Sequence, residues 1–127
     1  MKRAFLPAAL ALLLAPCALP AAEPGLTLEQ KAALRCSAAF AIVAGDQQRG
    51  LPAAQAYPPL QERGKEYFVR TAARLMDDLS VPRESVEAML KQEVERLLAE
   101  RAASPDPEAT TGRLMGPCLL SLDASGI

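Results

Sequence analysis

One amphipathic helix anchors the predicted fold, and residues 27–43 encode most of it: TLEQKAALRCSAAFAIV. Thr27 stands directly before the apolar-periodic stretch and Gln30 follows three positions later, the sequence signature of a capping box. Two glycines and a proline follow between positions 45 and 52. The pattern therefore predicts a helix from Leu28 to Gln48.

This first helix carries a cysteine on its apolar side. At about 100° per residue, Cys36 shares one arc with apolar neighbours, whereas Arg35 and Ser37 fall mostly outside that arc. The predicted buried stripe consists of Leu28, Ala32, Cys36, Ala39, Phe40 and Val43. Cys36 is therefore expected in the core.

A second helix is predicted over residues 59–79, after a connection rich in Ala and Pro. Its expected core face repeats at the three- and four-residue spacing of a helix and consists of Leu60, Gly64, Tyr67, Phe68, Ala72, Leu75, Met76 and Leu79. Gly64 has no side chain, so a neighbouring helix can approach closely at this point.

A third helix is predicted to follow the Ser80-Val81-Pro82 break and to end near Ala103. Ser80 is able to cap it, and Pro82 is tolerated in a first helical turn. Its core face is expected to comprise Val86, Met89, Leu90, Val94, Leu97 and Leu98. The short connection favours antiparallel packing of this helix against the second one.

The opposite faces of the second and third helices are charged and are predicted to be solvated. On the second helix, Glu66 precedes Arg70 and Arg74 precedes Asp78 by four residues, so each couple is expected to form an ion pair. Charge alternates in the same way along the third helix.

The chain ends in a predicted short helix. The stretch Ser104-Pro105-Asp106-Pro107 prevents the third helix from continuing, because proline cannot donate to the i−4 carbonyl. A last apolar face then follows, made of Leu114, Met115, Cys118, Leu119 and Leu122, with Pro117 either in the first turn or kinking the helix. The predicted fold class is all-α, a small bundle of three longer helices plus a short C-terminal helix.

Cys36 and Cys118 are predicted to form a structural disulfide that ties the first helix to the last. Both lie on apolar faces, and exported proteins meet oxidising conditions. A bond closing a loop of roughly eighty residues is worth about 4 to 4.5 kcal/mol by loss of chain entropy in the unfolded state. A redox-active pair is the alternative, but the Cys-x-x-Cys spacing of catalytic dithiols is absent.

The N-terminal residues have the three-part layout of a secretory signal, with two basic residues, an apolar run and a small-residue segment. We predict a signal peptide at residues 1–22, cleaved after Ala21 or Ala22, and a single helical domain at residues 23–127 in the periplasm or outside the cell. The apolar run is shorter than the roughly 20 residues of a membrane span, so the mature form should have no integral membrane segment. Lipidation at Cys17 is the alternative, which Pro16 disfavours because that position normally holds Gly, Ala or Ser.

Charge and composition exclude nucleic-acid binding. Removing Lys2 and Arg3 from fourteen basic residues leaves twelve against fifteen acidic ones, a net charge of −3. Nucleic-acid binders need a basic face and stacking aromatics, and this chain has few of either.

The residue types also limit the chemistry. The chain has no histidine, so it lacks a common zinc ligand and the usual general base of catalytic triads. It also has no glycine-rich loop that could bind a phosphate. Paired carboxylates remain, namely Asp77 with Asp78 and Glu93 with Glu95, but such near neighbours diverge on a helix, so each is predicted to lie on a solvated face. We therefore expect no catalytic, cofactor-binding or metal-binding residues.

Three stretches resemble a group of small uncharacterised exported helical proteins of alphaproteobacteria. They are RCSAAFAIVA (35–44), RGKEYF (63–68) and CLLSLD (118–123). The resemblance implies a helical exported protein with the same two cysteines, and it brings no assigned activity. In broad architecture the chain is also similar to small periplasmic acid-stress chaperones and to periplasmic immunity proteins that neutralise toxins, an analogy of fold and location.

The leading functional hypothesis is a non-enzymatic periplasmic interaction protein with a protein partner. The first alternatives are an acid- or envelope-stress chaperone, which opens when its carboxylates are protonated, and a toxin-neutralising immunity-type protein. The last alternative is a carboxylate-dependent hydrolase that uses Asp77, Asp78 or Glu66 near Tyr67.

Overall fold

The computed structural model describes residues 25–127, which form four α-helices and one short 3₁₀ helix, with no strand among them. In chain order these are α1 (Leu28–Gln48), η1 (Pro52–Ala56), α2 (Gln61–Leu79), α3 (Arg83–Ala103) and α4 (Pro107–Ala124). The predicted all-α class is confirmed. The predicted signal peptide, its cleavage site and Cys17 lie outside the described residues.

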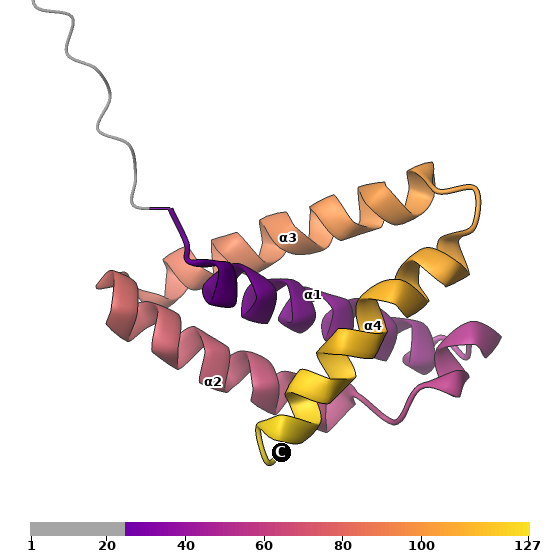
Figure 1. Cartoon of the computed structure of the whole chain (residues 1–127), viewed down its shortest axis with the longest axis horizontal. Coiled ribbons are helices and arrows are strands. Elements are labelled where there is room, and N and C mark those ends of the chain that lie inside the picture. The colour runs from indigo at the N-terminus through magenta and orange to yellow at the C-terminus, as the bar shows by residue number, and fades with distance from the viewer. Residues whose placement is uncertain (1–24) are drawn as a thin grey trace, which may run out of the picture.

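The helix α1 is the centre of the bundle. Figure 1 shows α2 and α3 diverging from their connection, with α1 running between them and α4 crossing it. All three other α-helices and η1 contact α1. The bundle is therefore organised around its first helix.

The start of α1 is the predicted capping box. Thr27 Oγ1 accepts a hydrogen bond from the Gln30 amide at 3.1 Å, and Gln30 Oε1 accepts one from the Thr27 amide at 2.9 Å. Two otherwise unpaired amide groups at the helix start are thereby satisfied. The predicted bounds of this helix match the observed ones.

Burial along α1 depends on position along the axis more than on the angle around it. The middle of the helix is enclosed, and even Ser37 and Ala38 are buried there. The predicted core residues Leu28 and Ala32 are exposed, Leu28 to 85%. The predicted stripe was wrong at these two positions, because the neighbouring helices surround the middle of α1 and leave its first turns free.

The helix α2 approaches α1 closely at Gly64. A Cβ atom at this position would lie 2.9 Å from the Cβ of Phe40. The ring of Phe40 is fully buried and meets that of Tyr67 edge-on, with the centroids 5.2 Å apart. The close approach that Gly64 predicted is therefore confirmed, and the two aromatic rings fill the core beside it.

In the connection between α2 and α3, Ser80 does not cap the start of α3 as predicted. Ser80 has φ of 53° and ends α2 in the left-handed conformation, with its amide donating to the Met76 carbonyl. Pro82 precedes α3, and no side chain caps that helix. The predicted capping role of Ser80 was wrong, because the chain needs a left-handed residue to leave α2.

The helix α3 packs mainly on α1. It meets α2 near their connection, where Leu75 of α2 and Val86 of α3 enclose Leu34 of α1 in a small second core. The expected antiparallel contact of α2 with α3 is thus limited to this end, since α1 occupies the space between them (Figure 1).

The last helix begins earlier than its apolar residues predicted. Asp106 Oδ1 accepts a hydrogen bond from the Ala109 amide at 3.0 Å, and Pro107 occupies the first helical position. This capped start gives α4 a length of 18 residues, so it is not the short helix expected. Pro117 lies inside α4, where its ring nitrogen cannot donate to the Arg113 carbonyl.

Candidate functional site

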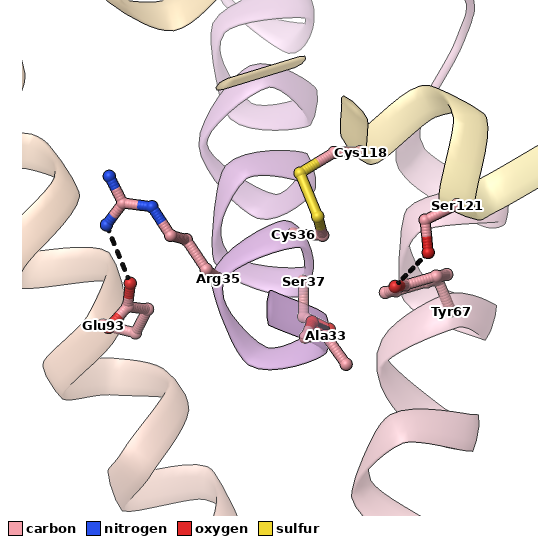
Figure 2. Close-up of a disulfide and its surroundings, with 8 residues drawn as sticks. All are labelled: Ala33, Arg35, Cys36, Ser37, Tyr67, Glu93, Cys118 and Ser121. Atoms are coloured by element: carbon pink, nitrogen blue, oxygen red, sulfur yellow. Dashed lines mark hydrogen bonds and ion pairs between the residues drawn. A yellow bond between two sulfur atoms is a disulfide. The ribbon is translucent and has the colours of Figure 1, made fainter. Parts of the chain in front are cut away.

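The predicted disulfide between Cys36 of α1 and Cys118 of α4 is present (Figure 2). The sulfur atoms are 2.08 Å apart and the Cα atoms 5.2 Å, and the two residues expose only 8% and 1% of their surfaces. Beside the bond, the Tyr67 hydroxyl of α2 lies 2.8 Å from the Ser121 hydroxyl of α4. Burial in the core shields the bond from dissolved thiols, which supports a structural role.

The carboxylates proposed for hydrolysis do not come together around Tyr67. Glu66 accepts a hydrogen bond from Arg70 at 2.9 Å, which confirms that predicted ion pair. Asp78 instead accepts from the Gln30 side chain at 3.1 Å, and the predicted pair with Arg74 is not formed in the part of the chain that the structure describes. The Tyr67 hydroxyl is hydrogen-bonded to Ser121 of α4, and Tyr67 lies toward the opposite end of α2 from Asp78.

Glu93 lies in the interior, contrary to the expectation of a solvated face. It exposes 7% of its surface and accepts a hydrogen bond from Arg35 of α1 at 3.2 Å. Arg96 is a second ion-pair partner of this carboxylate. Glu93 follows Leu90 by three residues and precedes Leu97 by four, so it stands in line with the apolar face of α3. That spacing along the sequence is the pattern from which the buried position of Glu93 could have been predicted.

Arg35 joins α1 to α3 through a second carboxylate. Its guanidinium donates to Glu100 Oε2 at 2.7 Å. This hydrogen bond lowers the pKa of Glu100 and raises the pKa of Arg35, so both groups hold their charges more firmly. Arg35 therefore has a structural role that its position outside the predicted stripe did not indicate.

Asp46 near the end of α1 is a second buried carboxylate, and sequence reasoning missed it. It exposes 6% of its surface and accepts a hydrogen bond from Arg101 of α3 at 2.7 Å, with Arg49 as a further partner. Burial alone raises the pKa of Asp46, but the hydrogen bonds from the two arginines outweigh it and hold the pKa below its ordinary value. Asp46 follows the apolar Val43 by three residues, and this helical spacing is the pattern from which its burial could have been predicted.

A groove of about 500 Å³ opens beside the pair of Asp46 and Arg101. Its walls come from the ends of α1 and α3, from the segment around η1 and from the first turns of α4. Most of the lining is apolar and includes Val43, Leu51, Pro52, Ala53, Ala56 and Tyr57. Binding sites commonly combine such apolar walls with a few fixed polar groups. We call this site the η1 groove.

The side chain of Gln47 holds the η1 wall in place. Its amide nitrogen donates to the carbonyls of Ala54, Tyr57 and Pro58 at 2.9 to 3.2 Å. Its oxygen accepts a hydrogen bond from the Leu60 amide at 3.1 Å. One residue of α1 therefore satisfies four backbone groups of the connecting segment, which orders the groove before any ligand arrives.

The described residues contain no group of three or more histidine, cysteine or acidic side chains arranged to hold a metal ion. Among the helices of residues 25–127, none combines the length and the apolar character needed to cross a membrane.

Comparisons with protein-family models, with curated proteins and with solved structures found no match for this chain. The site itself is therefore the basis of any functional assignment.

Proposed function

We propose that this chain is a non-enzymatic, exported protein-interaction module that binds an apolar peptide segment of a partner protein in the η1 groove. The observation that carries the proposal is a groove with mostly apolar walls whose shape is held by the Gln47 hydrogen bonds and by the Asp46–Arg101 pair. A site ordered in advance loses little entropy on binding, which favours affinity.

The dimensions of the groove suit a few side chains of a partner. Its volume of about 500 Å³ falls in the range of sites that enclose small groups. Leu51 exposes 42% of its surface at the rim and would become covered by a bound segment. Removing this apolar surface from water would supply the main favourable term of binding.

Export is part of the proposal. The signal-like residues 1–22 and the pair of Cys36 and Cys118 support it, because stable disulfides form in oxidising compartments. The partner is then expected in the periplasm or outside the cell, and an exported toxin neutralised by an immunity-type protein is one such partner.

Capture from periplasmic extract with the mature, oxidised protein tests this function. The variant Ala53→Arg places a charge among the apolar walls and should abolish the capture of a saturable partner. Ala88→Arg is the matched control, because Ala88 is exposed on α3 and does not line the groove. The proposal fails if no saturable partner is captured, or if the two variants capture it equally.

An acid-responsive chaperone is the second candidate function, favoured by the buried carboxylates Asp46 and Glu93 between α1 and α3. Protonation of Asp46 would remove its ion pairs with Arg101 and Arg49 and loosen the contact between α1 and α3, which would expose the apolar faces beneath. Binding of a hydrophobic dye should rise steeply below about pH 4 if this is correct. Dye binding that stays constant down to pH about 2 would rule this function out.

A further inference from the structure

A second and more polar hollow lies where α1, α2 and the end of α4 meet. It consists of two adjoining cavities of about 240 and 230 Å³, and both are lined by Ala33 of α1 and by Thr71 and Arg74 of α2. The two cavities adjoin at these three shared residues, and we call the pair the Thr71 hollow. Ala33 and Tyr67, which borders the second cavity, are drawn in Figure 2.

The hydroxyl group of Thr71 is available to a ligand. Thr71 exposes only 7% of its surface, and its hydroxyl makes no hydrogen bond within residues 25–127. By contrast, the helical hydroxyls of Ser37, Thr110 and Thr111 each donate to the carbonyl four residues earlier, at 2.8 to 3.0 Å. No fully buried side-chain oxygen or nitrogen of the described residues lacks a partner, so the Thr71 hydroxyl reaches the surface of the hollow, where a ligand can bind it.

Arg74 brings an unpaired positive charge to the same place. Its neighbour Arg70 is held by Glu66 and by the Ser125 carbonyl, whereas Arg74 has no ion-pair partner among the described side chains. A guanidinium beside a free hydroxyl is a suitable pair of donors for a carboxylate, since both can donate to its oxygen atoms.

The end of the hollow near the start of α1 is acidic. Glu29 and Asp78 both line it. Asp78 Oδ2 accepts a hydrogen bond from Gln30 at 3.1 Å, which orients the carboxylate, while Glu29 has no ion-pair partner in the described part of the chain. These two carboxylates are suited to bind a cationic group and would repel a ligand that is only anionic.

We propose that the Thr71 hollow binds a small zwitterion, an amino acid or a dipeptide. Its carboxylate is held by Arg74 and the Thr71 hydroxyl, and its ammonium group by Glu29 and Asp78. The arrangement of one basic and one acidic region complements the two charges of such a ligand. This site is separate from the η1 groove, so the inference stands independently of the proposed interaction function.

Isothermal titration of the mature, oxidised protein tests the ligand class. The probes are alanyl-alanine, its N-acetylated form, its C-amidated form and inorganic phosphate. We expect saturable binding of the dipeptide and about tenfold weaker binding of each capped form, because each loses one charge-assisted contact. Phosphate should not bind. The proposal is overturned if no probe gives a saturable isotherm, if the capped forms bind as well as the dipeptide, or if phosphate binds as well.

Variants then locate the site. Arg74→Gln and Thr71→Val should each weaken dipeptide binding about tenfold, and Ala33→Leu should block the hollow while retaining its charged groups. Arg83→Gln is the matched control, an exposed arginine on α3 that does not line the hollow. Melting temperatures establish that each variant is folded. Undiminished binding by a folded Arg74→Gln or Ala33→Leu protein would place the dipeptide elsewhere and refute the site.

Discussion

Arg101 of α3 donates a hydrogen bond to Asp46 of α1 at 2.7 Å, although 55 residues separate the two along the chain. The same contact borders the η1 groove. A single buried ion pair therefore joins two helices and shapes one wall of the candidate site, so its loss should affect both stability and binding.

Acid should destabilise the protein through Asp46. The folded state holds the pKa of this carboxyl below its ordinary value, so Asp46 contributes stability above its unfolded pKa of about 3.9. That contribution is lost as the pH falls through the folded pKa. We expect the free energy of unfolding, measured with urea, to decline below about pH 4. The variant Asp46→Asn, which retains one acceptor oxygen for the arginines, should be about 2 kcal/mol less stable at pH 7 and should decline less in acid.

The control for this pH series is Asp77→Asn. Asp77 is exposed on α2 and has no ion-pair partner in the described structure, so its replacement should leave the curve nearly unchanged. If Asp46→Asn declined in acid as steeply as the wild type, Asp46 would not be the group responsible.

Replacing Glu93 should cost far more than replacing Glu95. Glu93→Ala leaves Arg35 and Arg96 without their shared carboxylate and should lower the free energy of unfolding by about 3 kcal/mol. Glu95→Ala changes an exposed residue and should shift it by less than about 0.5 kcal/mol. Chemical denaturation of both variants gives the comparison, and equal effects would contradict the burial of Glu93.

An alanine at Gly64 should destabilise the protein although alanine favours helices. The added Cβ would lie 2.9 Å from that of Phe40, and such overpacking costs about 1 to 3 kcal/mol. Gly45→Ala on α1 is the matched control, because nothing lies within 4 Å of its added Cβ. This control should gain up to about 1 kcal/mol from helix propensity. Thermal melts that change in the same direction for both variants would contradict the close contact.

Loss of the disulfide should lower the melting temperature by about 20 °C. The bond spans 82 residues, and the chain-entropy relation gives about 4.5 kcal/mol for a loop of this length. Melts of the oxidised protein and of Cys36→Ala/Cys118→Ala measure the difference. Thiol titration of the native protein is the accompanying test, and two reactive thiols in the mature protein would contradict the bond.

Several parts of the fold could be predicted because they depend on neighbours within one helical turn. The capping box of Thr27 and Gln30 requires residues only three positions apart. The apolar positions of α2 repeat with helical spacing, and Gly64 stands among them as the point of close approach. The errors occurred where a neighbouring element decides the outcome, as at Leu28, which no other helix covers.

The candidate sites were beyond sequence reasoning for the same reason. Asp46 resembles any acidic residue near a helix end until α3 places Arg101 beside it. Thr71 resembles an ordinary helical threonine until its missing hydrogen bond and its burial are both known.

The sequence by itself determined the helical class, the bounds of α1 and the pairing of Cys36 with Cys118, because periodicity, capping and the number of available cysteines are local or countable properties. Only the tertiary structure decided that Asp46 and Glu93 are buried and that the η1 groove and the Thr71 hollow exist. Those features arise where helices distant in the chain meet, and the partner of a charged side chain across such a contact is set by packing rather than by spacing along the chain.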